Sequence, residues 1–552
     1  MNRTNSRKRY HEIGRVLAHH GFGWLWSKWG IGQILGKLER RPGEEAGVVL
    51  TEPERLRLAI EELGTTAIKL GQMLSTRPDL LPPDYIVELS KLQDHAPTVP
   101  YDEIAAILRD EFGAEPDATF QSFEVQPLAA ASIAQVHGAT IADGTEVVVK
   151  VRRPGIEVRV NQDLTILEQI ARFLAKNTEF GKRLDLESLA NEFAVTLNNE
   201  LDFTREGHNA ERVAAEFSED PSLLVPTIHW DYSTRCVLTM QKIQGIKVDD
   251  IEALDAAGID RQELAQRCAH IALVQVLDNG FFHADPHPGN FFVQPDGMIA
   301  LLDYGMVGRL GDRFRESLLR LAMAISRHDS NRIVDELLTL GAAPVSLDRR
   351  RMKRDLESLL SRYDGLALGE ISAAQVFRDV TTTAQHHGLK LPSDLILLAR
   401  VLAMDEGLGV KLDPEFKLME FARPYFMRFW QENHSFRAVA RRAREGAIDL
   451  ADIAMDLPER LLRLSGMVER GEVTVTSRLQ VPEELTKNLQ QAANRIAISV
   501  LTAGLIIGLS VMALVYRPAG SEGFGYFLLK ALLAIGVASA TWLLVAFWRS
   551  KR

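Results

Sequence analysis

Two long uncharged segments near the C-terminus constrain the fold of this chain more than any other feature. Twenty-one residues without a charged side chain run from Ile496 to Tyr516, and eighteen more run from Ala531 to Trp548. At about 1.5 Å per residue, a helix of the first length spans the roughly 30 Å hydrocarbon core of a bilayer. We therefore predict two transmembrane helices, joined as a hairpin, within residues 491–552. The alternative is a buried helical hairpin of a soluble core.

The charges around these segments predict their orientation. Arg495 precedes the first segment, and Arg549, Lys551 and Arg552 follow the second. Positive flanks stay on the cytoplasmic side, so both ends of the hairpin are expected there. The first apolar stretch of the chain is short and broken by His and Lys, which does not indicate a signal peptide. The bulk of the chain is thus expected in the cytoplasm, on a multi-pass membrane anchor.

Residues 1–49 form a basic and aromatic segment. Trp24, Trp26 and Trp29 lie close to Lys28. Tryptophan and lysine on one helix are typical of a membrane interface. A helix packed on the body of the protein explains the same pattern, and both interpretations stay open.

Composition excludes several classes of protein. Apolar residues make up 46% of the 552 residues and charged residues 25%, so the chain is neither disordered nor fibrous. Its net charge is 64 − 74 = −10, which argues against nucleic acid as the main partner. Two cysteines, Cys236 and Cys268, offer no metal-ligand spacing and no disulfide framework, and they favour reducing surroundings.

The pattern of apolar residues changes along the chain. Residues 52–76 have helical periodicity, whereas short apolar runs with an Asp143-Gly144 turn begin near Phe120. A long helical stretch is expected over 161–217, and mostly helical sequence from Asp249 to about 490 surrounds a second Asp-Gly turn at 296–297. We predict an α+β fold in five parts, with boundaries at 1–49, 50–119, 120–243, 244–490 and 491–552.

The segment 281–305 carries the densest chemistry. Asp285, Asn290 and Asp303 lie on a loop, a hairpin and a turn that can aim their oxygens into one cleft. Such hard oxygen ligands suit Mg²⁺. In phosphoryl transfer, one Asp handles the incoming oxygen while an Asn and a second Asp hold the metal. As single residues these are ordinary turn formers, but the set favours a magnesium-dependent site.

His283 and His287 flank Asp285 and offer an alternative zinc site. Zinc prefers three or four nitrogen or sulfur ligands, and nothing nearby adds a matching spacing. We expect these histidines to orient the loop through hydrogen bonds to the backbone.

Lys150 ends the run EVVVK in the β-rich part. A buried ammonium is costly unless a carboxylate or a phosphate accompanies it. The candidates are Glu200, Asp202 and Glu206. On one continuous helix, Asp202 and Glu206 share a face and Glu200 points elsewhere, which predicts two different partners.

Together these motifs resemble the UbiB family of atypical, protein-kinase-like proteins that support ubiquinone biosynthesis. The resemblance runs from about residue 50 to the C-terminus and includes the membrane hairpin typical of bacterial members. The motifs that carry it are KLGQ at 69–72, AAAS at 129–132, VVVK at 147–150, ELD at 200–202, HADPHPGN at 283–290 and LDYG at 302–305.

The resemblance implies an atypical protein-kinase-like fold of two lobes, with an N-terminal helical extension and the C-terminal transmembrane hairpin. It implies ATP and Mg²⁺ as cofactors. Lys150 is similar to the lysine that contacts the α/β-phosphates, with Glu206 as its ion-pair partner. Asp285 resembles the catalytic aspartate, and Asn290 and Asp303 resemble the metal ligands.

Two further motifs separate this family from ordinary kinases. The residues that replace the glycine-rich phosphate loop are Ala129, Ala130, Ala131 and Ser132. Alanine disfavours positive φ, so we expect the nucleotide to sit differently. Lys69 and Gln72 resemble the extension that folds over the active site, where Lys69 would pair with Glu200 or Asp202 and occupy the place of a protein substrate.

The implied function is a membrane-anchored ATPase or atypical kinase at the bacterial inner membrane. It would help quinone-biosynthesis enzymes reach isoprenoid phenol and quinone intermediates within the membrane lipids. No APE triplet or clear activation segment follows Gly305, so a peptide substrate has no obvious platform. The alternatives are a small-molecule phosphotransferase and a nucleotide-binding scaffold without turnover.

Overall fold

The computed structural model of the chain describes residues 3–23, 50–75, 77, 80–92, 96–178, 181, 185–341, 347–363, 372–389, 391–434 and isolated positions between 500 and 534. Two compact units divide the chain, Met1–Ala440 and Arg441–Arg552, and every element named below belongs to the first. The predicted hairpin at 491–552 and the tryptophan cluster lie outside the described residues, apart from those isolated positions. Among the described residues, no helix has the length and apolar character that a membrane span needs.

A four-stranded antiparallel sheet forms the core of the β-rich part. Its order is β1-β2-β3-β5, from β1 (Ser122–Ala130), β2 (Ala134–Thr140), β3 (Glu146–Arg152) and β5 (Val237–Gln241). The predicted Asp143-Gly144 turn joins β2 to β3, and Gly144 adopts the left-handed φ of 87° that such turns require.

Alternate side chains of a strand point to the same face of a sheet. In β3 these residues are valines, which makes one face of the sheet apolar. Val147, Val149 and Val151 are fully buried and pack with Ile104 and Leu108 of α7 (Tyr101–Phe112). The short helix α8 (Pro116–Thr119) leads into β1. Lys150, between two inward valines, is therefore turned to the opposite face.

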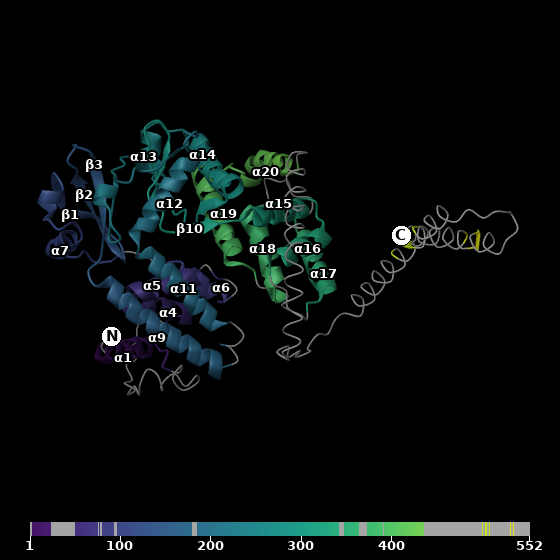
Figure 1. The fold of residues 1–552 in the computed structure, drawn as a ribbon, viewed down its shortest axis with the longest axis horizontal. Coiled ribbons are helices and arrows are strands. Elements are labelled where there is room, and N and C mark those ends of the chain that lie inside the picture. Colours follow the sequence, from purple (N-terminus) through teal and green to yellow (C-terminus); the bar gives the residue numbers. More distant parts are fainter. Residues whose placement is uncertain are drawn as a thin grey trace, which may run out of the picture. The chain divides into compact units, whose positions relative to one another are not determined.

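Six helices gather beside the sheet in Figure 1 and contact one another. They are α1 (Arg3–His19), α4 (Glu52–Leu63), α5 (Thr65–Ser75), α6 (Pro83–Leu89), α9 (Ile156–Asn177) and α11 (Leu186–Glu200). The first four belong to the predicted extension or precede it. The last two are inserted between β3 and α12 (Phe203–Glu216), the helix that packs on β5.

The continuous helix predicted over 52–76 is wrong, because Gly64 divides it into α4 and α5. Gly64 adopts φ 89°, which residues with a Cβ rarely do. The carbonyl of Leu63 instead accepts hydrogen bonds from the guanidinium groups of Arg9 (2.9 Å) and Arg159 (3.4 Å). These distant arginines satisfy a helix end that the local sequence does not reveal.

The predicted helical stretch 161–217 is also divided. Asp202 lies between α11 and α12 as the N-cap of α12, and its Oδ1 accepts the N–H of Thr204 at 3.2 Å. Asp202 and Glu206 therefore do not share a helix face as expected, because an Asp side chain competes for the backbone and starts a new helix.

The larger part is helical around small sheets. Its helices are α13 (Ile251–Ala256), α14 (Arg261–Leu273), α15 (Asp312–Ser326), α16 (Ser330–Leu340), α17 (Arg349–Leu360), α18 (Ala373–His386), α19 (Ser393–Leu412) and α20 (Leu418–His434). Its strands are β4 (Leu223–Leu224), β6 (Ile246–Lys247), β7 (Phe281–His283), β8 (Phe291–Val293), β9 (Ile299–Leu301) and β10 (Val307–Arg309). They form a sheet of order β4-β9-β8-β6 and a β10-β7 pair.

The β8–β9 hairpin and the β7–β10 pair matter most for the site. Phe291 pairs with Leu301 and His283 pairs with Val307. The residues just before β8 and just after β9 therefore lie beside each other. The loop after β7 and the turn before β10 meet at the same place, because their strands are paired.

Candidate functional site

Lys150 forms a bidentate ion pair with Glu206. Its Nζ lies 2.8 Å from both carboxylate oxygens, and the two side chains are 17% and 7% exposed. The ammonium also lies 5.3 Å from the centre of the Phe203 ring, a cation–π distance. Strand β3 and helix α12 are thus fastened together on the face of the sheet opposite α7.

The protonation of this pair follows from its surroundings. Burial acts to lower the pKa of Lys150, but the carboxylates of Glu206 and Asp303 outweigh it and raise that pKa above its usual range. Burial raises the pKa of Glu206 against the opposing pull of Lys150. The carboxylate therefore depends on the lysine to stay ionised.

Asp303 follows β9 and is half-buried near Lys150. Its Oδ1 accepts the Gly305 N–H at 2.8 Å, which fixes the DYG turn. Burial acts to raise the pKa of Asp303, yet Lys150 and the Gly305 N–H outweigh it and keep the pKa below its usual value. Asp303 is therefore a carboxylate at neutral pH.

The hairpin register brings Asn290 to the same place. Asn290 precedes β8, and its carbonyl accepts the N–H of Leu302 at 3.1 Å, next to Asp303. Its side-chain amide donates to the carbonyl of Asp285 at 3.5 Å. Asp285, Asn290 and Asp303 thus come together from a loop, a hairpin and a turn, as the sequence predicts.

His283 holds this arrangement through backbone contacts. Its Nε2 donates to the carbonyl of Asp303 at 2.6 Å, and its Nδ1 accepts the Asp285 N–H at 3.1 Å. Burial lowers its pKa, which agrees with a neutral ring. Both nitrogens are used, so His283 is not available to zinc. The Nδ1 of His287 accepts the Gly289 N–H at 3.1 Å, and the expected orienting role is confirmed for both residues.

A π-helical turn supports the same loop. It spans Val274–Asn279, directly before β7, and the Oε1 of Gln275 accepts the His283 N–H at 3.1 Å. Such turns widen a helix by one residue and recur near functional sites. Nothing in the local sequence indicates this one.

Arg400 is a site residue that sequence reasoning missed. It lies on α19, and its Nη2 is 2.6 Å from the Oδ1 of Asp285. The two side chains are 31% and 33% exposed. Asp285 is thus oriented by a guanidinium group from 115 positions away in the sequence. No motif around Arg400 predicts this contact.

Asn209 is a second missed residue. From α12 it donates to the carbonyl of Tyr304 at 3.0 Å, so α12 holds the DYG turn as well as Lys150.

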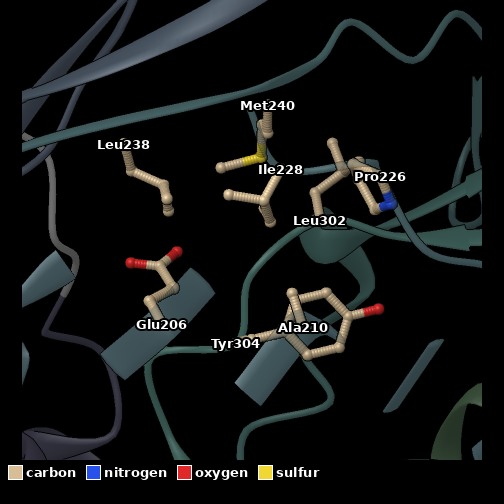
Figure 2. A pocket seen from close by; sticks show the side chains of 8 residues that line it. All are labelled: Glu206, Ala210, Pro226, Ile228, Leu238, Met240, Leu302 and Tyr304. Carbon is tan, nitrogen blue, oxygen red and sulfur yellow. The ribbon is translucent and has the colours of Figure 1, made fainter. Parts of the chain in front are cut away.

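Next to this contact lies a small apolar pocket between α12, β5 and the turn (Figure 2). Leu238, Met240 and Ile228 face Glu206 and Tyr304 across it, which leaves the carboxylate at an apolar wall.

The AAAS motif forms the end of β1 and the turn into β2. Ala129 pairs with Val136 and Ala130 with Gln135, and Ser132 is buried. The carbonyl of Ala131 accepts a hydrogen bond from Arg153 at 2.7 Å. The carbonyl of Ser132 accepts one from the Thr65 hydroxyl at 3.0 Å. The first residue of α5 therefore fastens the extension to this turn.

The extension makes its second attachment through Lys69. Its Nζ lies 3.1 Å from Glu200, with both side chains nearly buried. Of the two partners considered, Glu200 is the one observed. Asp202 instead caps α12 and lies 3.5 Å from Arg235. The charge of Lys69 also helps to lower the pKa of Asp303, so this lysine acts on the metal-ligand candidate.

Gln72 has a different kind of contact. Its amide donates to the carbonyl of Leu92 at 3.3 Å, beyond the end of α6. Gly71 beside it is tightly packed, since a Cβ there would lie 2.4 Å from a Leu92 methyl. The KLGQ motif therefore presents Lys69 to Glu200 and seats α5 on its neighbours through Gly71 and Gln72.

Comparison with known proteins identifies the family. Residues 91–337 match the model described as the ABC1 atypical kinase-like domain. Residues 356–417 match the UbiB helical domain, and 481–549 match the ABC1/UbiB kinase-like C-terminal domain. An uncharacterised protein of Synechocystis is 33% identical over 496 residues, covering 88% of this chain and 83% of that relative. The chain belongs to the UbiB family.

Two other proteins are similar to this UbiB-family chain. The probable protein kinase UbiB of Cellvibrio japonicus is 37% identical over 388 residues, which is 70% of each chain. A Mycobacterium tuberculosis protein solved in complex with erythromycin has a TM-score of 0.45 and 23% identity, over 66% of this chain and 92% of that chain. The predicted family and its kinase-like fold are confirmed.

The residues of this UbiB-family site fit a magnesium-bound nucleotide. Asp303 supplies a carboxylate oxygen and Asn290 an amide oxygen, the hard ligands that Mg²⁺ prefers, and the Asp285 carboxylate lies on the same loop as Asn290. Lys150 supplies an ammonium group that Glu206 holds in place, and an ammonium group suits a phosphate. The pair with Glu206 fixes the position of Lys150. Lys150 and the Gly305 N–H keep Asp303 ionised.

Proposed function

We propose that this UbiB-family chain is a membrane-anchored atypical kinase or ATPase that uses ATP and Mg²⁺ to support the biosynthesis of ubiquinone or a related isoprenoid quinone. One observation carries the proposal: Lys150 is paired with Glu206, and both Glu206 and the ionised Asp303 raise its pKa. The loop of Asp285 and Asn290 leads into the hairpin that ends at Asp303. Phosphoryl transfer needs this combination of a fixed cation, metal ligands and a carboxylate for the acceptor.

Each residue has a distinct task in this proposal. Glu206 holds the ammonium of Lys150 toward the α- and β-phosphates. Asp303 and Asn290 would hold Mg²⁺, which neutralises phosphate charge when it is bound. Asp285 accepts the proton of the incoming hydroxyl or water, and Arg400 orients its carboxylate.

Access to the site supports a small acceptor. Helix α5 is fastened to the AAAS turn by Thr65 and to α11 by Lys69. A folded protein substrate would have to displace both contacts. Water or a phenolic lipid needs less room, and the predicted membrane hairpin would bring the site near such lipids.

The relation to quinone biosynthesis rests on the relatives and the predicted anchor. The family and the probable protein kinase UbiB of Cellvibrio japonicus support it. We propose that the partners are the enzymes of that pathway and their isoprenoid phenol or quinone intermediates, at the bacterial inner membrane with the kinase-like body in the cytoplasm.

The first test is Mg²⁺-ATP hydrolysis by the purified full chain in liposomes, with and without a phenolic quinone-precursor analogue. Asp303→Asn should reduce turnover at least about 100-fold, because a metal ligand worth several kcal/mol is lost. Asp296→Asn is the matched control, since Asp296 is an exposed turn residue of the same hairpin whose Oδ1 accepts the Met298 N–H.

The outcomes separate the proposal from its alternatives. Turnover that rises with lipid and phenol and disappears only in Asp303→Asn supports a lipid-coupled enzyme. Equal hydrolysis in both variants would overturn the site assignment. Nucleotide binding without hydrolysis would favour a scaffold, and transfer to a soluble acceptor would favour a small-molecule phosphotransferase.

A further inference from the structure

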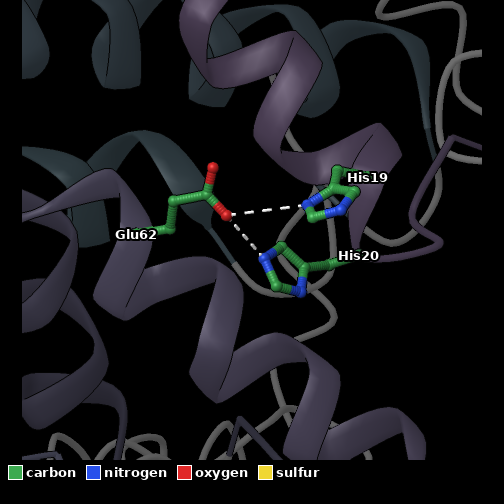
Figure 3. A group of neighbouring side chains, drawn as sticks. All are labelled: His19, His20 and Glu62. Atoms are coloured by element: carbon green, nitrogen blue, oxygen red, sulfur yellow. Dashed lines mark hydrogen bonds and ion pairs between the residues drawn. The ribbon is translucent and has the colours of Figure 1, made fainter. Parts of the chain in front are cut away.

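Two adjacent histidines and a glutamate converge where α1 meets α4. Helix α1 ends at His19, and the chain turns at Gly21 with φ 85°. Val16 of α1 packs against Ala59 and Leu63 of α4, which brings the last turns of the two helices together. Figure 3 shows both imidazole rings directed at the carboxylate of Glu62 from the neighbouring helix.

The spacing of the donor atoms is close to that of a metal coordination sphere. Glu62 Oε2 lies 2.8 Å from His20 Nε2 and 3.7 Å from His19 Nδ1. A tetrahedral zinc site with bonds of about 2.0–2.1 Å separates its ligand atoms by roughly 3.3–3.4 Å. Within the described part of the chain, no other trio of His, Cys, Asp or Glu has all its donor atoms within 4.8 Å of one another.

The tripeptide His-His-Gly of residues 19–21 occurs again at residues 386–388. The second copy shows that the end of a helix with this sequence does not by itself produce such a cluster. Helix α18 ends at His386, and His387 and Gly388 follow it, with Gly388 at φ 77°. There His387 pairs with Asp355 at 2.9 Å, and the pair gains no third ligand among the described residues. At α1, His19 is 74% exposed, its ring lies edge-on to the His20 ring at 5.0 Å, and it faces the same Glu62 oxygen as His20.

We propose that His19, His20 and Glu62 bind one divalent transition-metal ion, with Zn²⁺ as the preferred metal. Two imidazoles and a carboxylate are a known zinc ligand set that leaves the fourth position to water. Imidazole ligands disfavour Mg²⁺ and Ca²⁺, so this site does not compete for the metal of the nucleotide site. It shares no residue with that site and does not depend on the proposed function.

The place of the site gives the metal a structural effect. Glu62 lies two residues before Gly64, the break between α4 and α5, and α5 carries Lys69. A metal bridging α1 to this last turn of α4 holds the start of the extension in place. Metal binding should therefore raise the unfolding temperature of the chain.

The test uses the full chain in detergent, with any affinity tag removed and metal stripped by a chelator. Wild type should bind one equivalent of Co²⁺ with the visible absorption of a tetrahedral site, and Zn²⁺ should displace it. The double variant His19→Ala/His20→Ala should weaken binding at least about tenfold and abolish the Zn²⁺-dependent rise in unfolding temperature. The double variant His386→Ala/His387→Ala is the matched control and should bind like wild type.

Glu62→Gln is a second site variant that keeps the test valid if the double variant does not fold. It is nearly isosteric at a side chain that is 45% exposed, and it should also lose the tightly bound equivalent. Equal Zn²⁺ binding by wild type and both site variants would overturn the proposal. So would equal loss of binding in the His386→Ala/His387→Ala control.

Discussion

Asp285 does not face the candidate site as a lone carboxylate, because Arg400 lies 2.6 Å from it. We expect Arg400→Gln to lower ATP turnover by about tenfold, since a carboxylate that is no longer oriented loses part of the advantage of a positioned base. The affinity for nucleotide should change less than twofold. Arg400→Lys, which keeps the charge, should recover part of the rate.

Steady-state turnover and an independent nucleotide-binding measurement check this expectation. Arg378→Gln provides a control on the neighbouring helix α18, outside the site. If nucleotide affinity falls as much as turnover in Arg400→Gln, then Arg400 contacts the nucleotide and is not a positioning residue.

Asp405 of α19 has a buried carboxyl group that belongs to neither of the two proposed sites. It is 5% exposed, and its Oδ2 has no hydrogen-bond partner in the described part of the chain. Burial raises its pKa to about 8, against about 3.9 in an unfolded chain. The folded state therefore holds a proton that the unfolded state releases.

The sign of the resulting pH dependence follows from linkage. Between about pH 4 and 8, this group makes the folded chain less stable as pH rises, by up to about 1.4 kcal/mol per pH unit. Asp405→Asn removes the ionisation and should stabilise the chain more at pH 9 than at pH 5. Unfolding temperatures of both proteins at these two pH values test it, and a pH-independent difference would contradict it.

At the scale of elements, α5 depends on a nearly buried ion pair. Lys69 and Glu200 are 15% and 10% exposed, so removing one leaves the other charge poorly solvated. Lys69→Ala or Glu200→Gln should each destabilise the chain by about 3 kcal/mol. Each should also speed nucleotide release or alter nucleotide preference, because the Lys69–Glu200 ion pair no longer fastens α5 to α11.

A pair elsewhere in the extension supplies the control. Arg57 and Glu61 of α4 lie 2.7 Å apart at i and i+4, and they are 24% and 38% exposed. Glu61→Gln should cost less than about 1 kcal/mol and leave nucleotide release unchanged, because Arg57 keeps Glu88 as a partner at 3.2 Å. Denaturant unfolding and the release of a fluorescent nucleotide measure both effects. Unaltered release in Lys69→Ala and Glu200→Gln would count against the gating role of α5.

The sequence predicts elements well where the signal is local. The β2–β3 hairpin follows from Asp143-Gly144, and the meeting of Asp285, Asn290 and Asp303 follows from one continuous segment. The breaks at Gly64 and Asp202 escape prediction because helical periodicity runs across both. Arg9 and Arg159 hold the first break from distant helices, and such contacts leave no trace in the local pattern.

At the scale of the molecule, the fold class and the family are predictable because they rest on several motifs read together. Arg400 and Asn209 are not, since they reach the site from 115 and 95 positions away. Each is one polar residue on an ordinary helix until the fold brings it to the loop or the turn. The predicted membrane hairpin lies largely outside the described residues and stays a prediction.

Helix α12 has a consequence for how the molecule opens. It contacts β3 through Glu206 and the DYG turn through Asn209, so neither partner can separate while α12 stays folded. Backbone amides of α12 and of Gly305 should therefore exchange with deuterium in one cooperative step. Asn209→Ala should speed exchange at Gly305 more than in β1. The candidate site would then be lost as a unit, before the sheet beside it melts.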